Sequence, residues 1–202
     1  MTGNESALWQ GARIGLLGGT FDPPHTGHVQ MAQAARTTLD LDRVLFSVAP
    51  RPPHKDAAGT SDLAHRIEMV RLAIDGAPGL DITRIEEAHD VSFTVDLLRA
   101  CSAKTRADLY FILGADSLAE LHTWKDPEEI LRLATLVVFS RDEFPPYLDI
   151  PGTAGMVVFE SPRIDVSSTA LRQSLAGGAA PSGSLVRAVA DYAGRHRLYR
   201  GE

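Results

Sequence analysis

Short apolar runs alternate along the chain with segments of helical periodicity. The runs predict buried strands at 14–17, 43–49, 80–85, 108–114, 136–140 and 155–159. Between the first two runs, Val29, Ala32 and Ala35 recur at helical spacing, and similar faces follow most of the other runs. Strands that alternate with helices favour parallel pairing with right-handed crossovers. We therefore expect an α/β fold with a single doubly wound, Rossmann-like parallel sheet and helices on both faces.

Capping residues indicate where several of these helices begin. Thr26 is the predicted N-cap of the first helix, and Ser168 is that of a short helix late in the chain. Asp126, Pro127 and Glu129 predict a third start, with proline at the first helical position and a capping glutamate. A helix N-terminus carries partial positive charge and N–H groups, so the first of these helices is a candidate anion site.

Length and composition are those of an ordinary globular protein. The 202 residues fit one domain. We expect residues 1–11 to form a flexible leader and residues 12–202 a single domain with a helical C-terminal portion. Hydrophobic residues make up 44% and charged residues 23%, which argues against a disordered, collagen-like or coiled-coil chain. No apolar run approaches the roughly 18 residues that a membrane span needs, and the first residues show no signal peptide.

Charge and cysteine content narrow the function classes further. The 26 acidic and 20 basic residues give a net charge of −6, which argues against a dedicated nucleic-acid binder. Cys101 is the single cysteine and excludes an internal disulfide and a multi-cysteine zinc site. We expect a cytoplasmic protein without nucleic-acid or membrane partners. Whether the chain forms a homo-oligomer stays open at this stage.

The loop after the first predicted strand, GGTFDPPHTGH (18–28), carries the strongest chemical signal. His25 and His28 stand three positions apart at a strand-to-helix junction and can point the same way. Gly27 allows a ligand to approach the backbone. Imidazoles at this place can donate hydrogen bonds to phosphate oxygens. A zinc pair or two surface histidines are the alternatives, but zinc needs a third ligand, and the sequence offers no obvious one nearby.

Two further segments suggest anion binding. Ser168 and Arg172 lie one turn apart on a predicted helix and combine a hydroxyl with a guanidinium, although an ordinary capped helix explains them too. Arg51, His54 and Lys55 make a proline-framed loop locally basic in an acidic protein. The alternative for that loop is a solvated surface.

A fourth segment offers groups suited to a nucleoside. Gly114 ends a predicted strand, Asp116 can accept a hydrogen bond from ribose, and Trp124 can stack on a heteroaromatic ring. A lone tryptophan is more often a packing residue. The chain contains no GxxxxGK[ST], no GxGxxG after the first strand and no GxSxG, so these phosphate, dinucleotide and hydrolase signatures are missing.

GGTFDPPHTGH together with SSTALR resembles the HxGH nucleotidyltransferase superfamily, whose members transfer AMP or CMP from a triphosphate. PPHK (52–55), SFTVDLL (92–98) and GADSLAELHTW (114–124) narrow the resemblance to the bacterial nicotinate-nucleotide adenylyltransferases, which make deamido-NAD. The resemblance runs from about Gly15 to Arg172.

The resemblance implies that AMP passes from ATP to nicotinate mononucleotide. The chemistry of phosphates predicts direct in-line attack, with Mg²⁺ carried by ATP. No residue is named as a metal ligand, and direct contacts to the metal stay open at this stage. The implied catalytic residues are His25, His28 and Arg172. The implied ATP-binding residues are Gly18, Gly19, Thr20, Phe21, His25, His28, Gly114, Asp116, Ser168 and Arg172. The implied nicotinate mononucleotide-binding residues are His54, Lys55, Thr94 and Trp124.

Three rival interpretations remain. Phosphopantetheine adenylyltransferases share TFDP, the paired histidines and a similar arginine motif, but they are generally shorter and lack the GADSLxxLxxW pattern. Class I aminoacyl-tRNA synthetases share the HxGH loop, but no KMSKS-like segment is present here. A module that binds ATP without turnover is disfavoured by the full set of phosphate-handling residues. Phe93 and Leu97 depart from the tyrosine and threonine common in the family, which affects the fit around the nicotinate ring.

Overall fold

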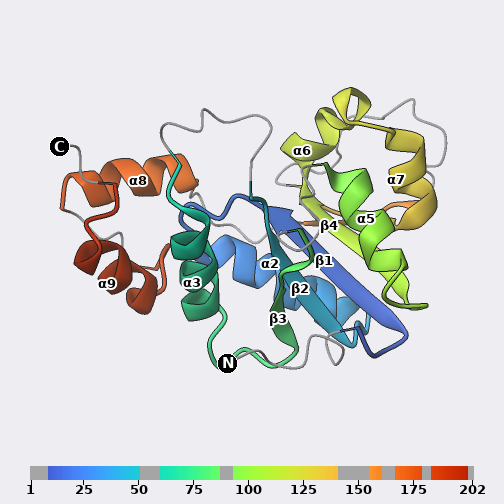
Figure 1. Ribbon diagram of the computed structural model, residues 1–202, viewed down its shortest axis with the longest axis horizontal. Helices are drawn as coiled ribbons and strands as arrows, with labels where there is room; N and C mark the ends of the chain where they lie inside the picture. The colour runs from blue at the N-terminus through green and yellow to red at the C-terminus, as the bar shows by residue number, and fades with distance from the viewer. Residues whose placement is uncertain are drawn as a thin grey trace.

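The computed structural model describes residues 9–50, 60–86, 93–140, 155–160, 167–178 and 183–199. Within these ranges, parallel strands form one six-stranded sheet in the order β3-β2-β1-β4-β5-β6. The strands are β1 (Arg13–Gly19), β2 (Arg43–Val48), β3 (Leu80–Thr83), β4 (Asp108–Gly114), β5 (Thr135–Ser140) and β6 (Val157–Glu160). The predicted parallel sheet is confirmed, and Figure 1 shows it in the middle of the molecule with helices around it.

Helices cover both faces of this sheet. They are α2 (Thr26–Thr38), α3 (Leu63–Ala73), α5 (Thr94–Ser102), α6 (Ala115–Ala119), the 3₁₀ turn η2 (Leu121–Thr123), α7 (Pro127–Leu133), α8 (Ser168–Ala176) and α9 (Arg187–Arg195). Ala35 and Val70, from α2 and α3, belong to the apolar cluster on one face. Leu98 and Ile130, from α5 and α7, belong to the cluster on the other. Burial of apolar surface on both faces confirms the doubly wound arrangement.

The predicted N-cap of α2 is wrong by one residue. His25 is the N-cap, and Thr26 is the first helical residue. The Thr26 hydroxyl lies 3.1 Å from the carbonyl oxygen of Gly183 and 3.2 Å from that of Ser184, and its backbone N–H donates to Ser184 at 3.1 Å. A contact with a distant segment thus replaces the local capping bond.

The predicted N-cap of α8 is wrong in the same way. Ser167 is the N-cap, and its Oγ accepts a hydrogen bond from the backbone N–H of Ala170 at 3.1 Å. Ser168 is helical, and its hydroxyl donates to the carbonyl oxygen of Pro23 at 3.0 Å. Ser167 therefore caps the helix, while Ser168 attaches it to the loop after β1.

The predicted start of α7 is confirmed in position but not in all its bonds. Asp126 is the N-cap and Pro127 is the first helical residue, but the Asp126 side chain makes no capping bond. Glu129 pairs instead with the Arg132 guanidinium, at 2.6 Å between Oε1 and Nη2. The capping glutamate is therefore a wrong prediction, because an arginine one turn further on takes up its carboxylate.

The described C-terminal helices lie beside α3, to one side of the sheet (Figure 1). Met69 and Ala73 of α3 form a third apolar cluster with Leu171, Leu185 and Val189. This cluster packs α8 and α9 against α3. It also holds α8 and α9 next to the loop that follows β1.

Trp9 falls within the segment expected to be a flexible leader. Its side chain is only 6% exposed and packs in the cluster that contains Leu98 and Ile130. An indole ring buries a large apolar area, so the packed part of the chain begins before the expected position 12. Residues 1–8 lie outside the described residues.

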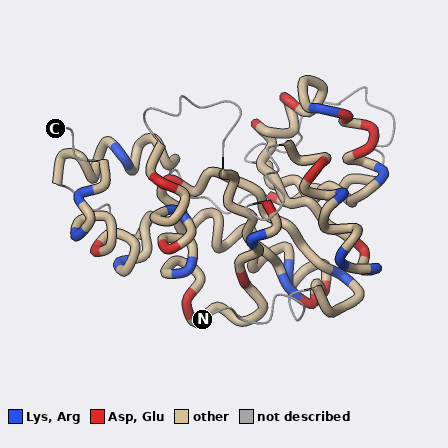
Figure 2. The backbone as a smooth tube through the Cα atoms, viewed as in Figure 1, with Lys and Arg blue, Asp and Glu red and all other residues tan. Residues whose placement is uncertain are grey.

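Acidic and basic residues are interspersed along the described backbone (Figure 2). This agrees with the modest net charge of −6. Among the described helices, none has both the length and the apolar character needed to cross a membrane.

Candidate functional site

The candidate site lies where the strand order changes direction. β1 pairs with β2 on one side and with β4 on the other. The helix that follows β1, α2, packs on one face of the sheet, and α7, which follows β4, packs on the other. In doubly wound sheets, ligands bind beyond the carboxyl ends of the strands at this point. Gly18 and Gly19 end β1, and Gly114 ends β4, so these predicted site residues stand at the same edge.

Phe21 shapes the turn that follows β1. Its φ of 51° is in the left-handed region, which is uncommon for a residue with a side chain. Its ring is 2% exposed and lies edge-on to His28, with centroids 5.0 Å apart. A Cβ at position 19 would lie 3.0 Å from this ring, which explains the glycine there. The Phe21 side chain therefore supports His28 from the core, and only its backbone is left to face a ligand.

The two histidines of the HxGH motif lie against each other. Their rings stack with centroids 3.7 Å apart and an angle of 26° between planes. The pair forms a capping box, in which Nδ1 of His28 accepts from the backbone N–H of His25 at 3.1 Å. Because Nδ1 accepts, the proton of the neutral His28 ring is on Nε2, where it can be donated to an anion.

Gly27 serves the packing of this pair. A Cβ at position 27 would lie 2.9 Å from Nδ1 of His25, closer than real Cβ atoms come to other atoms. The sequence suggested that Gly27 admits a ligand to the backbone, but the neighbour in the structure is the His25 ring. The motif spacing thus reflects the stacking geometry as well as the chemistry.

Arg172 and Ser168 reach this turn from α8. Nη1 of Arg172 donates to the carbonyl oxygen of Asp22 at 2.8 Å across a separation of 150 residues. Nη2 lies 3.3 Å from Oγ1 of Thr169. A guanidinium carries five N–H donors, so Arg172 retains capacity for a phosphate. The hydroxyl of Ser168 donates to the carbonyl oxygen of Pro23, so this serine docks α8 on the turn, and its predicted contact with ATP stays a prediction.

Arg66 is a buried structural residue of the site that no sequence pattern had indicated. Its side chain is 2% exposed, and burial lowers its pKa from the usual value. The guanidinium donates to carbonyl oxygens of Ala49 at 2.7 Å, Ser61 at 2.8 Å, Thr20 at 3.0 Å and Pro50 at 3.2 Å. One cation therefore ties the loops after β1 and β2 to the start of α3. Its position on the buried face of α3 was the available signal.

Asp22 is a second structural residue of the site that had no predicted role. It is 2% exposed, and its Oδ2 accepts from the backbone N–H of Ser61 at 3.0 Å. Its Oδ1 accepts from the Tyr199 hydroxyl at 2.7 Å. Burial, and then the bond to Asp22, raise the pKa of Tyr199 above its usual range, so the phenol keeps its proton as a donor. The DPP sequence indicated a turn but not a buried carboxylate.

The β4 side of the site carries the residues predicted for a nucleoside. Gly114 is the N-cap of α6, and a Cβ added there would meet open space. Asp116 is exposed in the first turn of α6. Trp124 is half-buried and meets Phe111 edge-on, with centroids 6.3 Å apart. One part of the indole is thus a packing surface, as the alternative interpretation held, while the rest is accessible.

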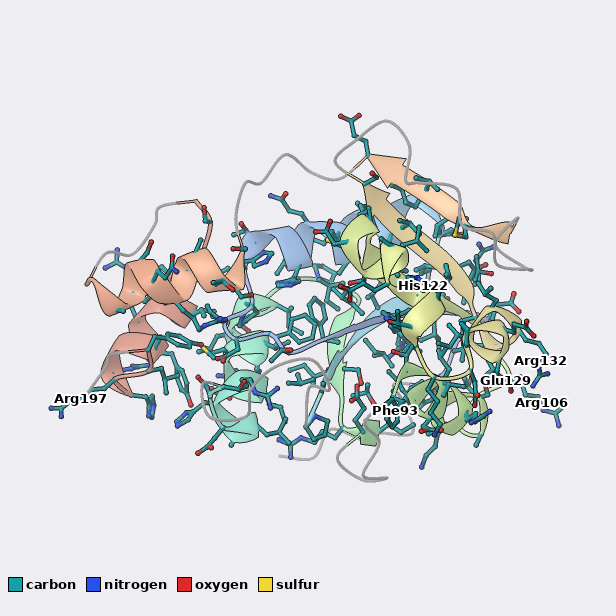
Figure 3. The ribbon with its side chains drawn as sticks, turned by 90° about the horizontal axis from the view of Figure 1, so that it is seen from above. Phe93, Arg106, His122, Glu129, Arg132 and Arg197 are labelled. Atoms are coloured by element: carbon teal, nitrogen blue, oxygen red, sulfur yellow. The ribbon has the colours of Figure 1, made fainter. Side chains whose placement is uncertain are left out.

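Thr94 is the first residue of α5 and is half-buried. Phe93, next to it, is 45% exposed, and Nζ of Lys125 lies 5.0 Å from the centroid of its ring. Figure 3 shows Phe93 far from Arg197, which lies in the C-terminal portion. Two other predicted substrate residues, His54 and Lys55, lie outside the described residues, as does Arg51.

Two buried titratable side chains, those of Glu86 and Cys101, have no predicted role. Ser47 Oγ donates to Oε1 of Glu86 at 2.5 Å, and burial raises the pKa of Glu86 although this bond opposes the change. Burial also raises the pKa of the Cys101 thiol, which lies in the core. A thiol of this kind is a poor nucleophile, so Cys101 is a packing residue.

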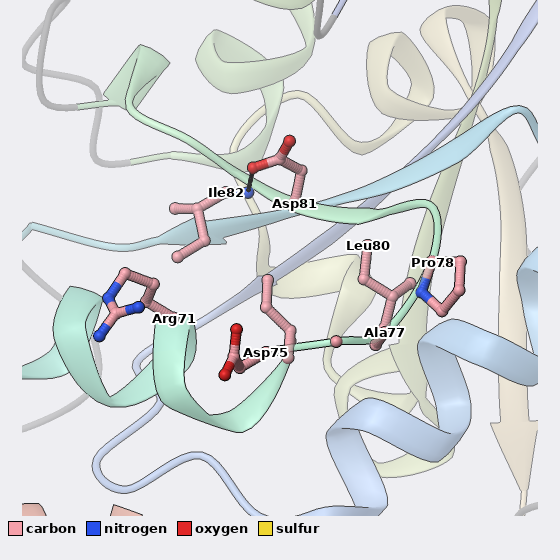
Figure 4. Close-up of a pocket in the computed structure, with 9 residues that line it drawn as sticks. Arg71, Asp75, Ala77, Pro78, Leu80, Asp81 and Ile82 are labelled. Carbon is pink, nitrogen blue, oxygen red and sulfur yellow. Dashed lines mark hydrogen bonds between the residues drawn. The ribbon is translucent and has the colours of Figure 1, made fainter. Parts of the chain in front are cut away.

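A surface hollow of about 450 Å³ lies at the turn between α3 and β3 (Figure 4). It is lined by Arg71, Ile74, Asp75, Gly76, Ala77, Pro78, Leu80, Asp81 and Ile82. Since β3 begins at Leu80, the hollow lies at the amino end of this strand. It contains no predicted site residue.

Comparisons with known proteins agree on one family. The cytidylyltransferase-like family model matches residues 16–174. The chain is 39% identical over 198 residues to the probable nicotinate-nucleotide adenylyltransferase of Roseiflexus sp. (strain RS-1), covering 94% of this chain and 98% of the relative. It is 40% identical over 190 residues to the protein of that name from Thermus thermophilus, covering 93% and 100%.

Solved structures show the same fold. The Plasmodium falciparum nicotinic acid mononucleotide adenylyltransferase complexed with NaAD matches with a TM-score of 0.78. The match covers 94% of this chain and 98% of that one at 18% sequence identity. At this identity the likeness is one of fold, and it agrees with the sheet order described above.

Proposed function

The chain belongs to the cytidylyltransferase-like family and, within it, to the nicotinate-nucleotide adenylyltransferases, and we propose that its chemistry takes place at the turn bearing His25. The enzyme transfers AMP from ATP to nicotinate mononucleotide, giving deamido-NAD and pyrophosphate, a reaction of NAD biosynthesis. One observation supports this location of the site: Arg172 donates a hydrogen bond to Asp22, which lies three residues before the stacked histidine pair.

A triphosphate requires positively polarised donors, and side chains supply them here. His28 can present an Nε2 proton, and Arg172 has donors beyond the one bonded to Asp22. The first helical N–H of α2, that of Thr26, is taken by Ser184. That N–H is therefore not among the donors that the turn offers to a phosphate, whereas imidazoles and a guanidinium are donors of the required kind. We propose that the histidines contact the ATP phosphates and Arg172 the pyrophosphate end.

The proposed reaction needs no general base. The phosphate of a mononucleotide has its second pKa near about 6 and is largely dianionic at neutral pH. One of its oxygens attacks the α-phosphorus of ATP in line, the bond from that phosphorus to the bridging oxygen breaks, and pyrophosphate leaves with the electron pair. The residues bring two anions together and stabilise the charge that develops on the leaving group.

We propose that Mg²⁺ enters with ATP. Magnesium prefers octahedral oxygen coordination and retains water molecules, which triphosphate oxygens and solvent provide. Within the described ranges, no three His, Cys, Asp or Glu side chains are grouped closely enough to hold a metal ion. The ion would neutralise phosphate charge, while Gly114 and Asp116 would border the adenosine.

We also propose a cytoplasmic location. The single cysteine is buried and suits a reducing compartment. ATP and nicotinate mononucleotide are the only partners that the proposed reaction requires.

Product analysis tests this function directly. Purified protein is incubated with ATP, Mg²⁺ and equal concentrations of nicotinate mononucleotide, nicotinamide mononucleotide and phosphopantetheine, and the products are resolved by mass. We expect deamido-NAD to dominate and pyrophosphate to appear in equal amount. ATP binding without pyrophosphate release would indicate a nucleotide-sensing module, and a preference for phosphopantetheine would indicate the rival adenylyltransferase.

Trp124→Ala tests the mononucleotide side of the site. We expect the KM for nicotinate mononucleotide to rise about 5-fold, because loss of an aromatic stack removes on the order of 1 kcal/mol. The KM for ATP should change by less than about twofold, since the phosphate donors are elsewhere. Trp124→Phe, which keeps a ring facing Phe111, is the matched control. A rise in the ATP KM alone would overturn the assignment.

A further inference from the structure

The C-terminal segment 183–199 holds the turn of residues 22–26 at both of its ends. At the α2 end, Ser184 accepts a hydrogen bond from the backbone N–H of Thr26 at 3.1 Å. At the β1 end, the Tyr199 hydroxyl donates to Oδ1 of Asp22 at 2.7 Å. The residues between these contacts include α9, so one segment leaves the turn and returns to it.

The return depends on how α9 ends. Arg197 has a left-handed φ of 53°, and the backbone N–H of Leu198 donates to the carbonyl oxygen of Ala193 at 2.9 Å. This geometry terminates a helix and reverses the chain. Tyr199 is also left-handed, with φ of 67°, and its ring packs against the cluster that contains Met69. The backbone conformation and the packing of the ring together fix the Tyr199 hydroxyl next to Asp22.

Asp22 joins this contact to the catalytic groups. Both oxygens of its buried carboxylate are engaged, one by Tyr199 and the other by the backbone N–H of Ser61. Its backbone carbonyl receives Nη1 of Arg172. A shift of Asp22 would therefore move the guanidinium and the residues leading to His25 together.

We infer that Tyr199 is a positioning residue for adenylyl transfer, whose hydroxyl fixes Asp22 and thereby aligns Arg172 and the His25 turn. The inference rests on the proposed function, because it concerns the rate of that reaction. A residue that only anchored the C-terminal segment would affect stability and leave the turnover of folded enzyme unchanged. Misplacement of a phosphate donor affects the transition state instead.

Tyr199→Phe removes the hydroxyl and keeps the ring. We expect kcat to fall about 10-fold, because small displacements of aligned groups have effects of this order or larger. The KM values for ATP and nicotinate mononucleotide should each change by less than about twofold. Tyr192→Phe is the matched control: it lies in the same segment, and its hydroxyl bonds Nδ1 of His65 at 2.9 Å. That variant should keep the wild-type kcat.

A double-mutant cycle identifies the route of the effect. In an Arg172→Ala background, Tyr199→Phe should lower kcat by clearly less than about 10-fold, since one of the two groups that it aligns is gone. Circular dichroism melting gives the folded fraction of each variant, and kcat is calculated per folded enzyme. An unchanged kcat in Tyr199→Phe, an equal loss in Tyr192→Phe, or a full 10-fold loss without Arg172 would overturn the inference. Absence of deamido-NAD with the wild-type chain would instead overturn the proposed function.

Discussion

Replacing His25 with alanine is expected to lower kcat for deamido-NAD formation about 100- to 1000-fold, the range seen when one donor to a developing anion is removed. The variant isolates the imidazole, because the backbone N–H of His25 still donates to Nδ1 of His28. His28 therefore keeps its tautomer, although it loses the stacked ring 3.7 Å away. Steady-state rates by pyrophosphate release measure the effect.

The KM for ATP should change by less than about threefold in this variant, because the interaction strengthens as charge develops in the transition state. His196→Ala is the control, since this exposed imidazole lies at the end of α9. It should keep the wild-type rate. Near-normal turnover in His25→Ala, or an equal loss in His196→Ala, would reject the catalytic assignment.

Arg172→Ala is expected to lower kcat/KM about 100- to 1000-fold and to weaken product inhibition by pyrophosphate at least about 10-fold. The guanidinium is the cation that α8 places against the turn, where it donates to Asp22. Removing it takes away donors to the leaving group and also leaves the carbonyl of Asp22 without this partner. Pyrophosphate inhibition constants, measured beside initial rates, separate this effect from a general loss of folding.

Arg172→Lys should recover little of this loss. An ammonium is a compact point charge and lacks the planar fork that can bond a carbonyl and a phosphate at once. Arg187→Ala is the matched control, because this α9 guanidinium is 93% exposed and lies 3.6 Å from Asp191. Salt bridges of this exposure contribute little, so we expect full activity. A comparable loss in Arg187→Ala would show that the effect of Arg172 is one of net charge.

The candidate site was predictable where a motif encodes local geometry. GGTFDPPHTGH indicated that His25 and His28 can point the same way at the start of a helix, and in the structure their rings stack there. Even here, the reason for Gly27 was different from the one expected, since His25 occupies the space. The roles of Gly114, Asp116, Thr94 and Trp124 stay predictions, because no contact among the described residues tests them.

The residues that hold the site together were not predictable from local pattern. Arg66 lies on an otherwise apolar helix face, and its four carbonyl partners belong to loops whose approach depends on the completed sheet. Asp22 was interpreted only as part of a turn. Its partner Tyr199 is 177 positions away. The position of neither residue in the sequence indicates a hydrogen bond between them.

By itself, the sequence determined the succession of strands and helices along the chain and the parallel class of the sheet. It also determined the chemical character of the loops at the carboxyl edge of this sheet. These follow from hydrophobic periodicity and turn chemistry, which act over a few neighbouring residues. Only the tertiary structure decided which partner each polar side chain takes. Thr26 and Ser168 have hydroxyls suited to local capping, yet both bond to carbonyl oxygens about 150 residues away. A buried polar group requires a partner, and packing of distant segments determines which one lies within reach.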